Sequence, residues 1–117
     1  MASNRLNWIK LLTAFAAFAV IASTATAGGA KTGGARVAVA KSSLGRILVD
    51  SKGITLYDFV EDKGTRSTCY DACASLWPPL ITAGKPIAGP GVRASLLGTT
   101  KRTDGELEVT YNRHPLY

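Results

Sequence analysis

The residues of this chain best suited to chemistry are Cys69 and Cys73, its only cysteines. On a helix, residues four apart share a face with their Cα atoms about 6 Å apart, which is within the range that a disulfide tolerates. In an oxidising compartment an even pair of this kind forms a bridge by default. Because the closed loop is very small, chain entropy predicts a stabilisation of only about 2 kcal/mol. We therefore expect a Cys69–Cys73 disulfide that acts as a modest structural staple.

A metal site is the alternative for the same two residues. Two thiolates and the imidazole of His114, the only histidine, would make a soft site suited to Cu(I). The Cys-x3-Cys spacing does not fit a zinc ribbon, a thioredoxin or a c-type haem motif. Two cysteines alone cannot close a structural zinc site. The alternative function is thus a periplasmic copper-binding or electron-transfer accessory protein that uses Cys69, Cys73 and His114. Without copper, we expect no cofactor.

Tyr57 and Asp62 form a second pair, Tyr-x4-Asp, shortly before the cysteines. The Asp62 carboxylate can fold back to the Tyr57 phenol or to N–H groups of the loop, as an Asx-type anchor does. We expect the Tyr57 ring to pack inward and to keep its hydroxyl at the rim. A polar ligand-binding corner, with Asp58 beside Tyr57, is the functional alternative.

Other arrangements that support catalysis are missing from the sequence. The serines stand outside any nucleophile-elbow context, and the glycines of residues 28–34 do not follow a strand as those of a phosphate-binding loop do. His114 precedes Pro115 and has the position of an exposed turn residue. We therefore expect no enzyme but an exported, non-catalytic module that binds or stabilises a component of the cell envelope, with no nucleic-acid partner.

The elements that must position these residues are mostly short strands. Apolar and β-branched residues flank the turn composition of residues 50–53, which predicts a hairpin over residues 46–60. Residues 99–102 and 106–111 flank the sequence Thr-Asp-Gly, which predicts a second hairpin.

One short helix is expected between the two hairpins. The segment from Cys69 to Leu76 is rich enough in alanine for two helical turns, and Trp77, Pro78 and Pro79 should end it, since a residue before proline avoids the helical conformation. The predicted fold is a mainly β, small single domain of antiparallel hairpins with this Cys-x3-Cys helix. An α+β class is the alternative.

A faint internal repeat relates the two hairpins. Shifting the chain by sixty residues lays Val49 on Val109, Leu56 on Leu116 and Tyr57 on Tyr117. A turn at Asn112-Arg113 should let residues 114–117 begin a strand that pairs back along residues 108–111. A strand of that length would leave its partner with unpaired backbone groups at an open edge.

The stretch LYDFVEDKGTRSTCYDACASLWPPL (residues 56–80) and the ending VTYNRHPLY together resemble a bacterial family of secreted repeats with a Tyr-x4-Asp motif, often labelled predicted lipoproteins. The resemblance covers roughly residues 45–117 and implies no defined activity. Members of that family continue after the second tyrosine to an aspartate and have glycine where Arg113 stands, so this chain looks shortened. The residues that carry the motif are Tyr57, Asp62, Trp77, Pro78, Pro79, His114, Pro115, Leu116 and Tyr117.

The first twenty-seven residues have the pattern of an export signal. Arg5 and Lys10 precede an apolar run over residues 11–22, and Ala25-Thr26-Ala27 is an A-x-A cleavage site. The apolar run is too short for a membrane span, which needs about 20 residues. No cysteine near this site offers a place for a lipid anchor.

The expected organisation is a signal peptide over residues 1–27, a flexible Gly-rich tether over 28–35 and one domain over 36–117. The net charge is +6 for the whole chain, and the basic residues are scattered singly, without the stripe that nucleic-acid binding requires. We expect the processed protein to be periplasmic or secreted.

Overall fold

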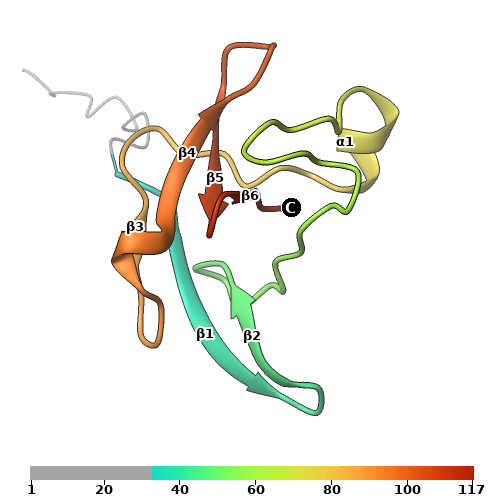
Figure 1. Ribbon diagram of the computed structural model, residues 1–117. Coiled ribbons are helices and arrows are strands. Elements are labelled where there is room, and N and C mark those ends of the chain that lie inside the picture. Colours follow the sequence, from blue (N-terminus) through green and yellow to red (C-terminus); the bar gives the residue numbers. More distant parts are fainter. Residues whose placement is uncertain (1–32) are drawn as a thin grey trace, which may run out of the picture.

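Two three-stranded sheets form the frame of the structure, a computed structural model that describes residues 33–117 (Figure 1). The predicted signal peptide and most of the predicted tether therefore lie outside the described residues. The first sheet has the order β2–β1–β3, with β1 Arg36–Ser42, β2 Gly45–Val49 and β3 Ile87–Ala88. The second has the order β4–β5–β6, with β4 Leu97–Lys101, β5 Leu107–Tyr111 and β6 His114–Pro115. Only β1 and β3 pair in parallel.

Helical structure is confined to two short segments of the described chain, α1 Ala72–Leu76 and the 3-10 turn η1 Ala94–Leu96. The predicted mainly β class, with antiparallel hairpins and one short helix beside the disulfide, is confirmed. No helix within residues 33–117 has the length and apolar character that crossing a membrane requires.

The first hairpin lies earlier in the chain than the sequence predicted. β1 pairs with β2 around a turn at Ser43 and Leu44, so the hairpin spans residues 36–49 and not 46–60. The chain does reverse again at residues 50–53, where Asp50 Oδ1 accepts the N–H groups of Lys52 and Ile54. The bridge between Val49 and Thr55 follows, and the Leu56 N–H donates to the Leu48 carbonyl. The predicted returning strand over residues 54–59 therefore pairs only as far as Leu56, because Tyr57 leaves β2 and pairs with Tyr117.

The helix is shorter than predicted. α1 begins at Ala72, and Asp71 before it has a φ of 52°, which breaks the helical path between the two cysteines. Thr68 does not cap the helix, because its hydroxyl donates to Asp62 at 2.6 Å. The helix ends at Leu76, directly before Trp77 and the prolines, as predicted.

The C-terminal hairpins form as predicted, but the expected open edge does not exist. Asn112 and Arg113 have φ values of 47° and 68°, the signs that a two-residue hairpin turn needs, and β6 pairs with the end of β5. Beyond β6, the backbones of Tyr117 and Tyr57 each donate an N–H to the other's carbonyl, both at 2.9 Å. The Leu116 carbonyl accepts the Leu80 N–H, also at 2.9 Å. Neighbouring segments of the chain thus pair with this edge.

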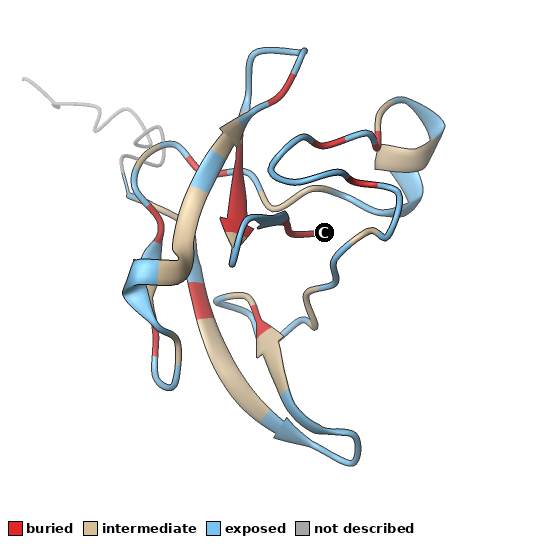
Figure 2. Cartoon of the chain, viewed as in Figure 1, coloured by how far each residue is buried: buried red, intermediate tan, exposed pale blue. Residues whose placement is uncertain are grey.

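The core joins the two sheets. Val37 of β1, Val109 of β5 and Leu116 are buried together, and Leu48, Leu56, Leu80, Val92, Leu97 and Tyr111 pack against them. Figure 2 shows that burial is concentrated on β5 and the chain end, whereas the tip of the β1–β2 hairpin is exposed.

The faint sequence repeat corresponds to two similar structural units. The first unit is residues 36–57 and the second is residues 97–117; each is a hairpin followed by a third extended segment that ends in Leu-Tyr. The Leu56 N–H donates to the Leu48 carbonyl, and the Leu116 N–H donates to the Val109 carbonyl. Leu48, rather than the Val49 aligned by sequence, is therefore the counterpart of Val109, because the two hairpins have turns of different length.

Candidate functional site

A buried polar cluster lies on the second unit, under the segment of residues 59–69. Its members, hereafter the polar cluster, are Asp62, Ser67, Arg102, Glu108 and Tyr117, and each is at most 7% exposed. The Tyr117 hydroxyl donates to Asp62 Oδ2 at 2.7 Å and lies 2.6 Å from the Ser67 hydroxyl. The motif aspartate, which follows the first unit in the chain, therefore binds the tyrosine of the second unit and not Tyr57.

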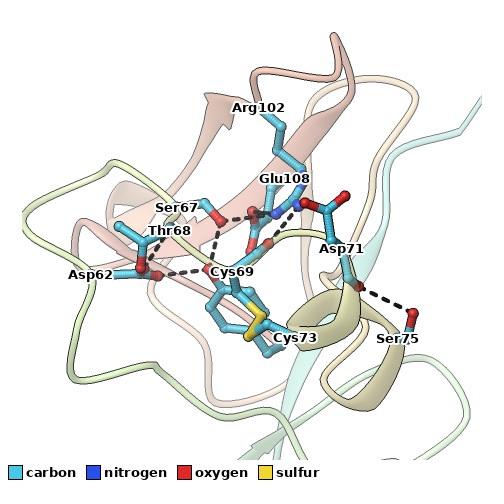
Figure 3. The surroundings of a disulfide bond; sticks show 10 residues. Asp62, Ser67, Thr68, Cys69, Asp71, Cys73, Ser75, Arg102 and Glu108 are labelled. Atoms are coloured by element: carbon cyan, nitrogen blue, oxygen red, sulfur yellow. Dashed lines mark hydrogen bonds and ion pairs between the residues drawn. A yellow bond between two sulfur atoms is a disulfide. The ribbon is translucent and has the colours of Figure 1, made fainter.

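Arg102 connects this cluster to the disulfide segment (Figure 3). Its Nη1 donates to Ser67 at 2.8 Å and to Glu108 Oε2 at 2.7 Å. Its Nη2 donates to the Cys69 carbonyl at 2.7 Å, and its guanidinium lies 4.2 Å above the centre of the Tyr70 ring. These four partners, three of them within residues 67–70 and one on β5, thus share one buried cation.

Burial determines the electrostatics of the cluster. Burial raises the pKa of the Glu108 carboxyl, and the hydrogen bond and charge of Arg102 offset only part of that rise. Burial likewise raises the pKa of the Tyr117 hydroxyl far above its ordinary value, so Tyr117 remains a hydrogen-bond donor to Asp62. Glu108 Oε1 is the single buried side-chain oxygen or nitrogen without a partner among residues 33–117.

Cys69 and Cys73 form the predicted disulfide, with their Cα atoms 5.2 Å apart. Only Cys73 lies in α1, whereas Cys69 lies in the extended segment before it. Cys69 is 1% exposed, and its carbonyl is the one that Arg102 binds. The bridge therefore fixes a hydrogen-bond acceptor of the polar cluster.

The polar cluster fastens residues 59–69 to the second unit. Besides Tyr117, Asp62 binds the N–H and the hydroxyl of Thr68 through Oδ1, at 2.8 and 2.6 Å, which confirms the predicted Asx-type loop anchor. Its groups are enclosed and bonded to one another, so the arrangement suits holding a loop in place.

Tyr57 has the opposite environment. Its side chain is 52% exposed, which contradicts the predicted inward packing, and its hydroxyl has no hydrogen-bond partner within residues 33–117. Its ring meets Trp77, also 52% exposed, edge to face with the ring centres 5.5 Å apart. Tyr70 lies elsewhere and packs on Arg102.

Three hollows of the surface border Tyr57. The largest, hereafter the Tyr57 groove, has a volume of about 560 Å³ and runs between the first unit and the turn of the β5–β6 hairpin. A smaller hollow of about 180 Å³ lies between Tyr57, Trp77 and the disulfide. The third, of about 350 Å³, is lined by Trp77, Pro78 and Pro79. This face is the candidate binding surface, and Tyr57 is common to all three hollows.

The structure separates the residues of the copper alternative. The two cysteines are bonded to each other, and they line the small hollow, whereas His114 is exposed on β6 and lines the Tyr57 groove. Within residues 33–117, no three or more His, Cys, Asp or Glu side chains are grouped so that they could hold a metal ion. Pro115 and Leu116 are buried within the second unit.

Sequence reasoning missed Ser67, Arg102 and Glu108 as site residues. Arg102 directly follows β4 and Glu108 lies in β5, so the two meet across the second hairpin, while Ser67 comes from a distant loop. The charged residues alone carried a weak signal, since an arginine and a glutamate at facing strand ends can pair.

Comparison with known proteins identifies the first half of the described chain. Residues 38–81 match a family described as a secreted repeat of unknown function. No curated protein and no solved structure matches the chain. The match includes Tyr57, Asp62, both cysteines and the Trp-Pro-Pro sequence, and it ends before the second unit. The family resemblance seen in the sequence is thereby confirmed by the match over residues 38–81.

Proposed function

We propose that this protein is an exported, non-catalytic binding module that engages a component of the cell envelope through the face around Tyr57 and Trp77. The observation that carries the proposal is the unequal use of the two repeat tyrosines. Tyr117 is buried, and its hydroxyl is hydrogen-bonded to Asp62 and Ser67. Tyr57 is half exposed, and its hydroxyl is hydrogen-bonded to no side chain within the described part of the chain.

Aromatic side chains of this kind are the usual anchors of binding surfaces. They offer a large contact area at low conformational cost and carry a polar group that fixes orientation. Leu76, Val60 and Ile54 are also 60–80% exposed and add to the apolar character of the protein surface. The polar cluster has a structural role in this proposal because its groups are enclosed.

The location of the protein outside the cytoplasm belongs to the same proposal. The signal pattern of residues 1–27, with cleavage after Ala27, would deliver the domain to the periplasm or the exterior, where the Cys69–Cys73 bridge persists. The family description as a secreted repeat supports export.

The experiment measures the binding of purified protein to washed cell envelopes of the producing bacterium. Tyr57→Ala and Trp77→Ala should each weaken binding about tenfold or more, as loss of an aromatic anchor does. The matched control is Ile87→Ala, since Ile87 is 45% exposed on β3 and lines none of the hollows beside Tyr57.

Equal binding by all three variants and the unchanged protein would refute the proposed surface. A copper role makes a different prediction. Protein with both thiols free and with tight Cu(I) binding that His114→Ala abolishes would favour the copper-binding alternative instead.

A further inference from the structure

We infer that the Tyr57 groove docks an extended acidic protein segment with the pattern of this chain's own residues 59–62, an aromatic residue followed three positions later by aspartate. The inference rests on the proposed function, in that both assign binding to the Tyr57 face. It adds the chemistry of the partner. The partner supplies a carboxylate that accepts a hydrogen bond from the Tyr57 hydroxyl, and an aromatic ring that packs against the Tyr57 ring.

The groove is the counterpart of the surface that residues 59–69 cover on the second unit. Strand pairing makes Ser42 of β1 the equivalent of Arg102 after β4, since Lys41 pairs with Arg46 and Lys101 with Leu107. By the same registers, Ile47 is the equivalent of Glu108. Both first-unit residues, together with Leu48, Thr55, Leu56 and Tyr57, line the groove.

The covered and open surfaces differ in burial at every one of these key positions. Arg102 is 3% exposed, Glu108 0% and Tyr117 6%. Ser42 and Tyr57 are exposed, and Ile47 is only partly buried. The same framework is thus buried where a segment lies over it and open where none does.

The covering segment shows what the open surface can hold. On the second unit, the Phe59 ring packs edge to face on the Tyr117 ring, with the ring centres 6.2 Å apart. The Asp62 carboxylate accepts a hydrogen bond from the Tyr117 hydroxyl at 2.7 Å. The backbones of Tyr57 and Tyr117 pair reciprocally, so a local two-fold relation carries one tyrosine onto the other. A segment placed on the first unit by that relation would bring its own aromatic residue and carboxylate to Tyr57.

The lining of the groove differs in charge from the covered surface of the second unit. Ser42 and Ile47 replace the buried charges of the second unit, so the floor of the groove is more apolar and needs no ion pair from its occupant. The Tyr57 hydroxyl and the His114 ring offer hydrogen bonds at its edge, and Asp58 is the one carboxylate of the lining.

The first test uses a peptide with the sequence of residues 58–68, titrated into the whole protein. We expect saturable binding that falls about tenfold or more when the peptide carries Asp62→Asn or when the protein carries Tyr57→Phe, which is the change expected for one hydrogen bond to a charged group. Binding should be unchanged in the Ile87→Ala protein.

The second test attaches the same segment after Tyr117, so that weak affinity cannot hide the interaction. The extended chain should unfold at a temperature about 4–8 °C higher than the original chain does. A shift of this size is typical of a small gain in the free energy of unfolding for a domain of this length. The rise in unfolding temperature should be smaller when the aspartate of the extension that corresponds to Asp62 is replaced by asparagine. It should also be smaller when the extended chain carries Tyr57→Phe.

The inference is overturned if the extension gives no rise in unfolding temperature, or the same rise with aspartate and asparagine. It is also overturned if the native protein forms a dimer that buries Tyr57 and excludes the peptide. Envelope binding that needs Tyr57 and Trp77 but no aspartate in the peptide would leave the proposed function intact while refuting this inference.

Discussion

The two units of this protein share a framework but differ in what covers it. In the second unit, the segment of residues 59–69 lies over Tyr117, Arg102 and Glu108 and encloses them completely. In the first unit, the equivalent side of Tyr57 is a groove. The difference teaches that the Tyr-x4-Asp motif does not act within one unit: its aspartate stabilises the tyrosine of the other unit.

The residues beneath each tyrosine correspond to this difference. The covered unit has the ion pair of Arg102 and Glu108, and Arg102 also bonds to the covering loop. The open unit has Ser42 and Ile47 at the equivalent positions. Both are uncharged, so the groove has no ion pair at the place where the covered unit has one. The covered unit thus contributes to internal stability, and the open unit carries the candidate binding surface.

The largest expected effect comes from removing the cation of the covered unit. Arg102→Met should lower the free energy of unfolding by about 3–5 kcal/mol, because it leaves the Glu108 charge buried without a partner. Denaturant unfolding measures the loss.

The control for this experiment is the equivalent position of the open unit. Ser42→Ala should change stability by about 0.5 kcal/mol or less, since its hydrogen bonds close only an exposed turn. Similar losses for the two variants would show that the units do not differ as described.

The two repeat tyrosines offer the most direct comparison. Tyr117→Phe removes a hydroxyl that lies between Asp62 and Ser67, and should cost about 1–3 kcal/mol because buried acceptors lose their donor. Tyr57→Phe should cost about 0.5 kcal/mol or less, since its hydroxyl has no protein partner among the described residues. Both changes delete one oxygen atom, and thermal unfolding of the pair measures the contrast. Equal costs would contradict the assignment of Asp62 to Tyr117.

Local patterns in the sequence predicted much of this fold. The Thr103-Asp104-Gly105 turn, the Asn112-Arg113 turn and the stop at Pro78 depend on nearby residues, and all three form as expected. The disulfide was equally predictable, because Cys69 and Cys73 have only each other. The first hairpin was misplaced because the chain turns at both residues 43–44 and residues 50–53. The long pairing forms around the earlier turn, and only a short segment pairs back after the later one.

The candidate site was less predictable because its contacts are distant in sequence. Asp62 and Tyr117 are 55 residues apart, and Ser67 and Arg102 are 35 residues apart. No spacing rule connects such pairs. The exposure of Tyr57 was missed for the same reason, since the segment that covers its counterpart, residues 59–69, is distant in sequence from the second unit.

The disulfide is expected to contribute an intermediate effect, confined to the covered unit. Replacing both cysteines by alanine should cost about 2 kcal/mol on the chain-entropy estimate for so short a loop. The loss should include weaker fixation of the Cys69 carbonyl that Arg102 binds, so amide exchange of the loop around Ser67 should accelerate. Exchange in the β1–β2 hairpin serves as the internal control, and a uniform acceleration throughout the chain would indicate general destabilisation instead.

The smallest effect concerns pH and again separates enclosed from exposed groups. Burial raises the pKa of Glu108 above its ordinary value of 4.5, so the folded protein holds that proton more tightly than the unfolded chain does. The contribution of this carboxyl to stability should therefore fall as the pH rises from 4.5 through the folded-state pKa. Asp104 behaves in the opposite way: the Glu106 N–H bond lowers its pKa below 3.8, so its contribution is present above that pH and is lost on further acidification. Denaturant unfolding between pH 3 and 7 should show that Glu108→Gln changes the slope of stability only above about pH 4.5, whereas Asp104→Asn changes it only below about pH 4. Identical slopes for the original protein and the Glu108→Gln variant would mean that the Arg102 charge fully compensates the burial of Glu108.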